Sequence, residues 1–197
     1  MSELRVIPVS EAPWHDVRTV FGTRGDPATC FCQFFKVDAA TWKSKDVAGF
    51  EHSLCEQVDA ARASRSAGPG VLAYLDDEPV GWAAVEARPA YPRILTGRAI
   101  PGSAQPDHDD AGVWAITCFV VRVGFRRRGV GAALLRGAVD QARRGGARVV
   151  EAYPVDTAGE KVSSAELYHG PLSTFEAAGF MISGRPLESR AVVELTL

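Results

Sequence analysis

The segment Val113–Val121 is an unbroken run of apolar and β-branched residues, and the chemistry of the chain changes sharply where it ends. A run of this kind is typical of a strand that is buried on both faces of a sheet. Three arginines, Arg126 to Arg128, follow, and a Gly-Val-Gly step then opens a stretch with apolar residues at helical spacing as far as Arg144. Glycines 145 and 146 end this predicted helix. We therefore expect a buried strand, a basic turn and an amphipathic helix in direct succession.

The rest of the chain alternates between strand-like and helix-like patterns. We expect a short strand followed by a helix from about Pro13, an amphipathic helix over 46–67, a hairpin of Val71–Leu75 and Val80–Glu86, a buried strand within 147–155, a helical segment over 163–178 that is interrupted at Gly170–Pro171, and a last strand over 191–197. Residues 22–36 are predicted to form an ordered loop or a short irregular piece, and residues 89–110 a long loop of the kind that often lies over a functional site. This order predicts a mixed α/β sheet with parallel neighbours around 113–153.

The composition is that of one soluble globular domain. With 197 residues, the chain is long enough for a single domain over 1–197 with a sizeable core. Lysine and arginine number 22 against 24 acidic residues, a balance that argues against a protein that coats nucleic acid. No apolar run approaches the roughly 20 residues of a membrane span, and the N-terminus lacks the basic start and apolar run of a secretory signal. These features predict a cytoplasmic protein without a membrane segment.

The four cysteines are expected to be free thiols, because nothing in the sequence marks the chain for export. Cys30 and Cys32 form a Cys-x-Cys pair, but no second cysteine or histidine pair follows at the spacing of a zinc site. We therefore predict no bound metal and buried, apolar-like thiols. Cys118, inside the buried strand, has a second interpretation as a nucleophile, which would require a depressed pKa.

Residues 126–132, called here the basic loop, combine three features that favour the binding of an anion. A helix start has unpaired backbone N–H groups and a partial positive charge. Glycines at 129 and 131 let an anion approach those groups, and arginine guanidinium groups suit phosphate oxygens. A nucleic-acid contact, a phosphate-bearing cofactor and a solvated helix start are the alternative interpretations.

The context of the basic loop favours a pyrophosphate site. The ATP-loop spacing is missing because no Gly-Lys-Ser/Thr follows, and the dinucleotide spacing is missing because Leu134 occupies the last glycine's place. What remains is a buried strand before the loop and an amphipathic helix after it. At this point the sequence resembles the GNAT superfamily of acyl-CoA-dependent N-acetyltransferases. The family signature Arg/Gln-x-x-Gly-x-Gly/Ala is matched by Arg126, Gly129 and Gly131, and Phe175–Phe180, "FEAAGF", resembles the late helix that ends in Gly-Phe.

The resemblance covers about residues 68–183 in the expected order and leaves 1–67 for helices and a loop on the acceptor side. It implies a single-domain GNAT-like α/β (α+β) fold, in which a mixed, twisted sheet flanked by helices has two central parallel strands that splay apart. Acetyl-CoA, the implied co-substrate, would lie in that opening. Its pantetheine would pair with the end of the buried strand and its pyrophosphate would rest on the basic loop; the implied binding residues are Phe119, Val120, Val121, Arg126, Arg127, Arg128, Gly129, Val130, Gly131 and Ala132.

The proton carriers that are usual in this family are absent from their expected positions. A glutamate on the strand before the loop often takes the proton of the amine, but Ala115 or Thr117 stands there. A tyrosine four residues before the glycine of the late Gly-Phe often acts as the acid, but counting back from Gly179 gives Phe175. A chain of water molecules that drains protons to solvent would need neither group.

Two other residues are the candidate catalytic groups. Glu151 would lie beside the cofactor if strand alternation turns it inward, and otherwise it is an exposed or rim carboxylate. Tyr168, which precedes His169, would bring a hydroxyl near the thiol, or else it is a packed aromatic side chain with one exposed edge. The break at Gly170–Pro171 makes its position hard to count.

The sequence thus predicts an N-acetyltransferase that moves an acetyl group from acetyl-CoA to the primary amine of an unidentified small-molecule or peptide acceptor, by direct attack in a ternary complex. The alternative is a non-catalytic acyl-CoA-binding or regulatory domain. Aromatic residues of 30–36, 41–43 and 91–95 are interpreted either as acceptor contacts or as core, and the carboxylates Glu86, Asp107, Asp109 and Asp110 either as groups that attract a cationic amine or as solvated side chains. Nucleic acid is a minor alternative as a partner and no membrane is implied. A homodimer is compatible, because many folds of this kind dimerise through sheet edges or late strands.

Overall fold

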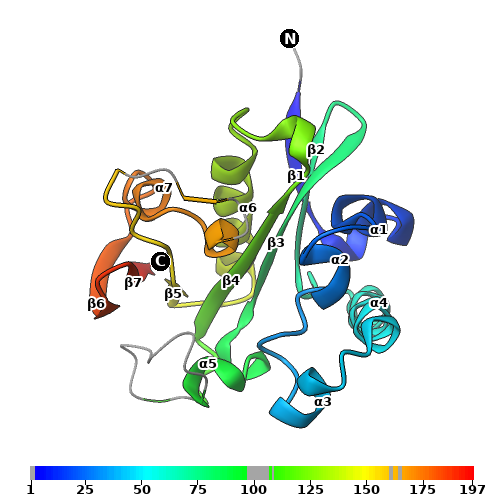
Figure 1. Cartoon of the computed structure of the whole chain (residues 1–197), viewed down its shortest axis with the longest axis horizontal. Coiled ribbons are helices and arrows are strands. Elements are labelled where there is room, and N and C mark those ends of the chain that lie inside the picture. Colours follow the sequence, from blue (N-terminus) through cyan, green and yellow to red (C-terminus); the bar gives the residue numbers. More distant parts are fainter. Residues whose placement is uncertain (1–2, 97–106, 108, 160–161, 164–165) are drawn as a thin grey trace.

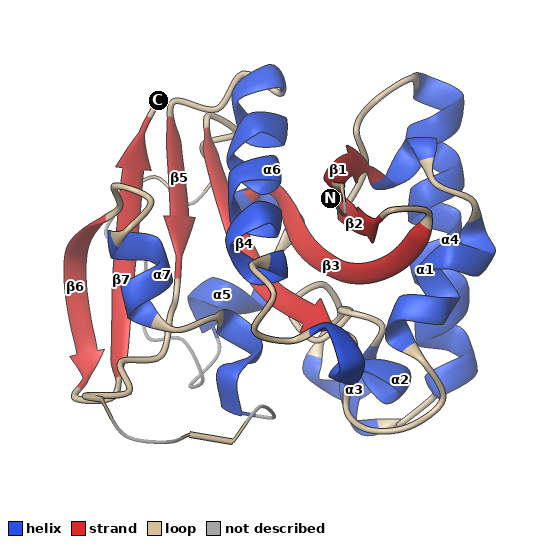
Figure 2. Ribbon diagram, turned by 90° about the horizontal axis from the view of Figure 1, so that it is seen from above, coloured by secondary structure: helices blue, strands red, loops and turns tan. Residues whose placement is uncertain are grey.

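The computed structural model describes residues 3–96, 107, 109–159, 162–163 and 166–197. Their strands form one seven-stranded mixed sheet in the order β1-β2-β3-β4-β5-β7-β6, and helices lie on both of its faces (Figures 1 and 2). The strands are β1 (Leu4–Pro8), β2 (Gly70–Leu75), β3 (Glu78–Ala87), β4 (Val113–Val121), β5 (Val149–Ala152), β6 (Met181–Leu187) and β7 (Arg190–Thr196). The helices are α1 (Trp14–Phe21), α2 (Pro27–Cys30), α3 (Ala39–Lys43), α4 (Val47–Ser64), α5 (Arg93–Thr96), α6 (Val130–Arg144) and α7 (Leu172–Glu176), with 3-10 turns η1 (Val9–Glu11), η2 (Arg88–Ala90), η3 (Val123–Phe125) and η4 (Glu166–His169). The predicted mixed α/β sheet is confirmed.

The structure departs from the sequence expectations in short elements. Residues 22–36, predicted as a loop or an irregular piece, contain helix α2. The predicted long loop over 89–110 begins within η2 and contains helix α5, while residues 97–106 and 108 lie outside the described part. Helix α3 and strand β6 had no expected counterpart. Helices of four or five residues are too short to display a periodic pattern, so the sequence gives little sign of them.

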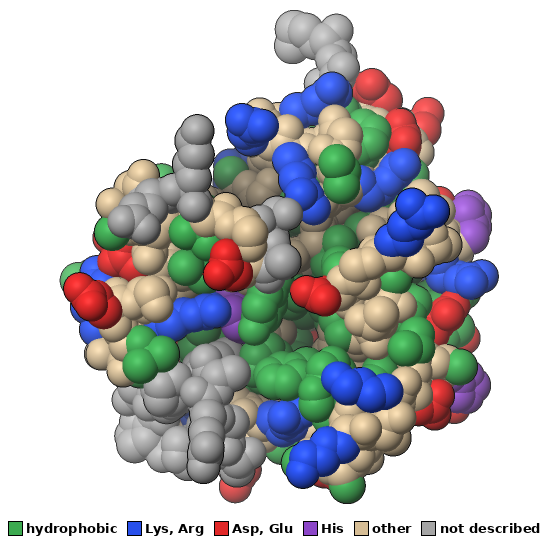
Figure 3. Space-filling model, viewed as in Figure 1, with side chains coloured by type: hydrophobic (Ala, Val, Ile, Leu, Met, Phe, Trp, Pro, Cys, Tyr) green, Lys and Arg blue, Asp and Glu red, His purple; other side chains and the backbone are tan. Residues whose placement is uncertain are grey.

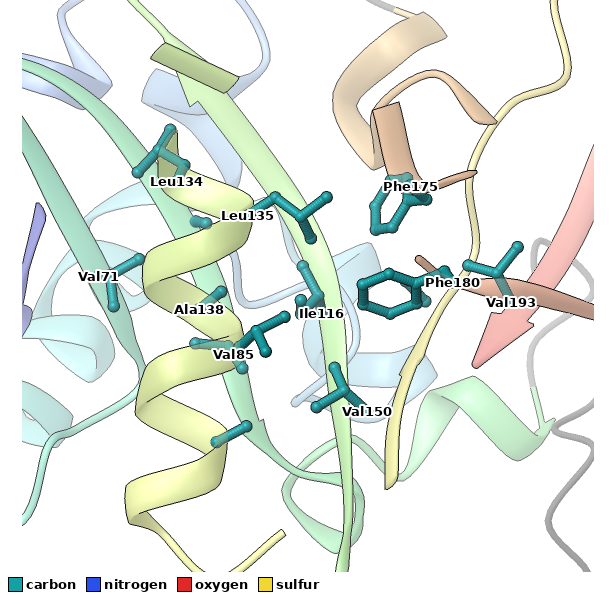
Figure 4. Packing of buried hydrophobic residues seen from close by; sticks show 14 of the residues in the cluster. Val71, Val85, Ile116, Leu134, Leu135, Ala138, Val150, Phe175, Phe180 and Val193 are labelled. Atoms are coloured by element: carbon teal, nitrogen blue, oxygen red, sulfur yellow. The ribbon is translucent and has the colours of Figure 1, made fainter. Parts of the chain in front are cut away.

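Helix α6 packs on one face of the sheet, and α1 and α4 cover the other face (Figure 2). On the first face, Leu134, Leu135 and Ala138 of α6 meet side chains of β2, β3 and β4 (Figure 4). Close approach requires a glycine at position 81 of β3, where a Cβ atom would lie 2.9 Å from side-chain atoms of Leu134 and Val130. The basic loop at the start of α6 is thus held firmly against the centre of the sheet.

Strands β4 and β5 pair in parallel over only four residues. Val113 to Ile116 of β4 pair with Val149 to Ala152 of β5, and β4 then continues to Val121 with β3 on its other side. The chain leaves the sheet at the end of β5, so the sheet opens beyond Ile116, as the resemblance implied. The turn η4 packs against β4 in this part of the structure. An opening between two halves of the sheet is the main feature of the fold.

Strand β4 carries one extra residue at the point where it parts from β5. Val85 of β3 pairs with Ile116, but its neighbour Ala84 pairs with Cys118, so Thr117 forms a β-bulge. The bulge reverses the alternation of side chains along the strand. Ile116 joins the core under α6, while Cys118 joins the core under α1 and α4.

None of the helices in the described part of the chain is both long and apolar enough to cross a membrane.

Candidate active site

The basic loop ends in an open helix start. Gly129 precedes α6 with φ 78°, a left-handed conformation that favours glycine. The first backbone bond of the helix runs from Ala133 N–H to the carbonyl of Gly129, and no side chain of the described residues caps the helix. The preceding amides of α6 therefore have no partner within the helix. A Cβ atom built at Gly129 or Gly131 would meet nothing within 4 Å, so the space before these amides is free for an anion.

The arginines of the basic loop are exposed around this helix start. Arg126 donates from Nε to the carbonyl of Val121 at 3.1 Å. The guanidinium of Arg128 lies 5.6 Å from the centre of the Phe125 ring, and that of Arg122 lies 5.1 Å from the same ring. Two cationic side chains are thus stacked against one aromatic ring beside the unpaired amides.

The edge of β4 beyond the bulge faces the opening. Arg122 N–H donates to the carbonyl of Val80 in β3, so the backbone groups of alternate residues, Phe119 and Val121, point away from β3. Two side-chain contacts agree with this alternation. The carbonyl of Val121 accepts from Nε of Arg126, and the carbonyl of Thr117 contacts Nδ1 of His169. Among the predicted pantetheine contacts, the backbones of Phe119 and Val121 face the opening, whereas that of Val120 faces β3.

Turn η4 brings Tyr168 and His169 to this edge. His169 is 1% exposed, and its Nδ1 lies 2.7 Å from the carbonyl of Thr117. A carbonyl can only accept, so Nδ1 carries the hydrogen and Nε2 is an acceptor, which has no partner among the described residues. Burial, with a smaller contribution from the charge of Arg190, lowers the pKa of His169 to about 3. The imidazole is therefore neutral at physiological pH.

Tyr168 packs against the cluster of side chains that contains Cys118 and Val120. Its ring centre lies 4.0 Å from that of His169. Burial raises its pKa, and the charge of Arg190 lowers it by a smaller amount. Tyr168 therefore belongs to the same cluster of side chains as Cys118, the residue that follows the bulge of β4. Phe175, at the position where the family tyrosine is expected, is fully buried and its ring packs on that of Phe119. It also packs on Phe180 (Figure 4).

Glu151 lies on β5 with its side chain fully buried. Its Oε2 atom is 3.8 Å from Nη1 of Arg88, which is equally buried, and Oε1 accepts from the hydroxyl of Tyr153. The alternative prediction of an exposed or rim carboxylate is therefore wrong, because β5 lies inside the sheet and β7 covers its outer edge. The role of Glu151 as a proton acceptor stays a prediction. No sequence pattern points to Arg88, which lies just after β3.

Three cysteines gather near the bulge. Cys32 and Cys118 are buried, as predicted, while Cys30 and Cys55 are partly buried. The pKa of Cys32 is raised, and hydrogen bonding to Cys118 is the largest cause. The pKa of Cys30 is raised as well, and hydrogen bonding to Cys32 is the largest cause. These two groups are thus thiols at neutral pH. Across the described residues, no group of three or more histidine, cysteine, aspartate or glutamate side chains is arranged to hold a metal ion.

The surface on this side is hollowed. Figure 3, which shows the face seen in Figure 1, has hydrophobic side chains around a hollow near the centre of the molecule.

The aromatic residues Phe35 and Tyr91 are buried in a cluster with Ala115 of β4 and Tyr153, so they belong to the core, the second of the two predicted interpretations.

Comparison with known proteins identifies the family of this chain. A model of the acetyltransferase (GNAT) family matches residues 34–169. Among solved structures, the PaiA N-acetyltransferase from Thermoplasma acidophilum in complex with coenzyme A is 10% identical, with a TM-score of 0.56 and 99% of each chain covered. YncA from Salmonella typhimurium with its cofactor acetyl-CoA is 14% identical, with a TM-score of 0.54, 100% of this chain covered and 94% of that one.

An N-acetyltransferase from Staphylococcus aureus Mu50 has the same identity, 14%, and the same TM-score, 0.54, over 100% of this chain and 98% of that one. Comparison with curated proteins gives no match. At these identities the solved structures establish the fold, while the family model covers more than half of the sequence, including the edge of β4 and the basic loop. The chain therefore belongs to the acetyltransferase (GNAT) family, a family of acyltransferase enzymes.

Proposed function

We propose that this protein transfers the acetyl group of acetyl-CoA to the primary amine of a small-molecule or peptide acceptor, by direct attack in a ternary complex. One observation carries the proposal: the edge of β4 at Phe119 and Val121, which pairs with no strand of the described residues, leads directly to the open helix start at the basic loop. An extended arm with amide groups suits a strand edge, and a pyrophosphate suits a helix start with nearby arginines. The solved PaiA and YncA structures, which hold coenzyme A and acetyl-CoA, have the same fold.

Removal of the arginine side chains is expected to weaken this binding. In the variant Arg126→Ala/Arg128→Ala, the dissociation constant for acetyl-CoA should rise about 10- to 100-fold, because charged hydrogen bonds to the phosphates are lost. Isothermal titration calorimetry measures the change. The matched control is Arg143→Ala, an exposed arginine at the other end of α6, which should bind like the wild type. An unchanged affinity of the double variant would contradict the assigned phosphate site, and wild-type protein that binds no acetyl-CoA at millimolar ligand would overturn the proposed function.

The chemistry requires two proton transfers. Acetyl-CoA, when bound, supplies a thioester carbonyl carbon for the amine to attack. A new C–N bond forms and the C–S bond breaks. The ammonium nitrogen of the acceptor loses two of its three protons and keeps one in the amide, and the thiolate takes up one. We assign the donor role to Tyr168, because it packs against the cluster that contains Cys118, the residue after the bulge, and burial raises its pKa. Glu151 stays the predicted proton acceptor from the sequence.

The variant Tyr168→Phe tests the donor role. Its kcat should fall roughly 100-fold, because a positioned acid is lost, while its affinity for acetyl-CoA should stay the same. In the wild type, turnover should decline at alkaline pH as the hydroxyl ionises, above the ordinary tyrosine range because burial raises the pKa. This alkaline decline should be absent from the variant. Equal kcat values in wild type and variant would contradict the role of Tyr168.

A non-catalytic acyl-CoA-binding or regulatory role is the second candidate. It is favoured by the absence of a carboxylate from β4 and by the burial of Phe175 at the usual tyrosine position. Release of CoA thiol, measured with a panel of primary amines, separates the two candidates. Turnover with any amine supports the enzyme, and acetyl-CoA binding without turnover favours the second candidate.

A further inference from the structure

Two of the buried polar atoms that have no hydrogen-bond partner among the described residues lie beside the opening. One is Nε2 of His169, an acceptor, and the other is Nη1 of Arg190, a cationic donor. His169 is almost fully buried, and Arg190, the first residue of β7, is partly buried. Buried donors and acceptors are nearly always paired in native proteins. These two atoms therefore indicate a ligand that satisfies both of them.

Turn η4 carries His169 across the opening. Nδ1 of His169 lies 2.7 Å from the carbonyl of Thr117 on β4, and the carbonyl of the next residue, Gly170, accepts from the N–H of Val155 at 2.9 Å. Val155 follows β5, so the end of the turn is joined to both halves of the sheet. The two nitrogens of an imidazole ring point in widely different directions. Nε2 of His169 therefore points away from the Thr117 carbonyl.

Arg190 lies on the side of the opening that faces β4. It forms a bridge with Val155, and it stands three residues before Val193, whose partner Ala152 is the last residue of β5 that pairs with β4. Since a strand advances about 3.3 Å per residue, Arg190 lies about 10 Å beyond the last pair of β4 and β5. Arg190 is thus at the level of the opening.

The charge of Arg190 reaches the turn η4. Burial is the main cause of the lowered pKa of His169, and the charge of Arg190 is the next one. Burial raises the pKa of Tyr168, and the charge of Arg190 opposes that rise. Figure 3 shows histidine and basic side-chain atoms next to each other at the edge of the hollow, on the side where Figure 1 shows β5 and β7. The guanidinium and the imidazole therefore border the same space.

The described carboxylates of this region are held by other groups. Asp156, in the segment after β5, pairs with Arg185 at 2.7 Å. Glu166, at the start of η4, accepts from the hydroxyl of Ser163 at 2.7 Å. An arginine keeps its charge at physiological pH, and its strongest partners are carboxylates and phosphates. An anion from outside the chain can therefore pair with Nη1 of Arg190.

We propose that the acceptor is an amine that also carries a carboxylate, an amino acid or a related amino carboxylate; this inference rests on the proposed function. The carboxylate pairs with the guanidinium of Arg190, and an N–H of the amine donates to Nε2 of His169. His169 takes no proton from the amine. It fixes one N–H of the nucleophile while Arg190 fixes the other end of the molecule, so the amine is held in one orientation beside β4.

Matched pairs of amines test the proposal in the wild type, with release of CoA thiol as the readout. Each pair is an amino carboxylate and the same molecule without its carboxylate: phenylalanine and phenethylamine, lysine and cadaverine, γ-aminobutyrate and propylamine. At least one carboxylate form should have a kcat/KM about 100-fold above that of its partner, because the partner leaves the buried atom of Arg190 unpaired.

The variant Arg190→Met should remove this preference. Its kcat/KM for the carboxylate form should fall about 100-fold, and the ratio between the two forms should approach one, while Arg190→Lys should keep part of the preference because the charge remains. A loss of equal size for both forms would indicate a structural role and contradict the proposal. Arg185→Met, which removes a partly exposed arginine from the neighbouring strand β6, is the matched control and should keep the wild-type ratio.

The variant His169→Asn tests the contact with the amine. The asparagine amide can still donate to the Thr117 carbonyl, but it has no atom at the place of Nε2. Because both forms of a pair contain the amine, kcat/KM should fall about 10-fold for both, and the ratio between them should stay as in the wild type. Wild-type kcat/KM values in this variant would contradict the contact. Thermal unfolding and acetyl-CoA binding show whether each variant is folded.

The wild type alone can overturn the inference. If it turns over the forms without a carboxylate as well as or better than the carboxylate forms, Arg190 binds no part of the acceptor, and the proposed function remains intact. A wild-type protein that turns over none of these amines would overturn the proposed function together with this inference.

Discussion

Replacement of Arg88 with Met is expected to lower the free energy of unfolding by about 3–5 kcal/mol, because it leaves the carboxylate of Glu151 buried without its ion-pair partner. Both side chains are 0% exposed, and Nη1 of Arg88 is 3.8 Å from Oε2 of Glu151. Tyr153 would still donate to Glu151, but one neutral hydroxyl does not replace a guanidinium. Urea-induced unfolding followed by circular dichroism measures the loss.

The double variant Arg88→Met/Glu151→Gln separates the charge from the packing. It should recover part of the lost stability, because no net charge is then left inside the sheet. Arg143→Met is the control: its ion pair with Asp140 is exposed, so its removal should leave the unfolding curve nearly unchanged. A single Arg88→Met variant as stable as the wild type would mean that the ion pair does not hold β5 against the end of β3.

Replacement of Phe175 with Ala is expected to destabilise the fold by about 3–5 kcal/mol, since it removes a fully buried ring and leaves a cavity. The ring centre is 6.0 Å from that of Phe119 on β4 and 5.3 Å from that of Phe180. Phe175 therefore ties α7 to the edge of the opening. The loss is measured by urea-induced unfolding, and Phe175→Leu, which fills more of the space, should lose less.

The variant Phe175→Tyr tests whether the usual family tyrosine can be restored at this position. It is expected to lose about 1–3 kcal/mol, because the added hydroxyl enters an apolar cluster without a partner, and it should not raise kcat. A gain in turnover would show that position 175 can reach the reacting atoms and would contradict the assignment of the donor role to Tyr168.

The parts of the fold that the sequence predicts are those with long, regular patterns. Strand β4 is a continuous apolar run, and α6 and α4 show helical spacing with clear ends, so each is found within a few residues. The sequence does not predict strand β6, because it is an edge strand whose residues are mostly exposed and show no alternation of apolar and polar side chains. It contains a glycine and a proline, which are uncommon in strands. Its pairing with β7, more than its own residue pattern, determines that it forms a strand.

The candidate site likewise contains residues that are consecutive in the sequence and residues that only the fold brings together. The basic loop can be predicted because its donors are consecutive in the chain and their chemistry needs only a strand end and a helix start. Thr117 and His169 come from distant segments, and only the packed fold brings them together. Tyr168 could be named but not positioned, because the turn after it breaks the helical count from Phe175.

The short pairing of β4 with β5 has an energetic meaning beyond the space it leaves for a ligand. Only four residue pairs join the strands β1–β4 to the strands β5–β7. Under the proposed function, a molecule bound in the opening would contact both halves, so its binding free energy would also stabilise the junction between them. By thermodynamic linkage, ligand at 100 times its dissociation constant adds about 2.7 kcal/mol to the stability of the bound protein. Under the proposed function, acetyl-CoA bound in the opening would thus reinforce the short junction between β4 and β5.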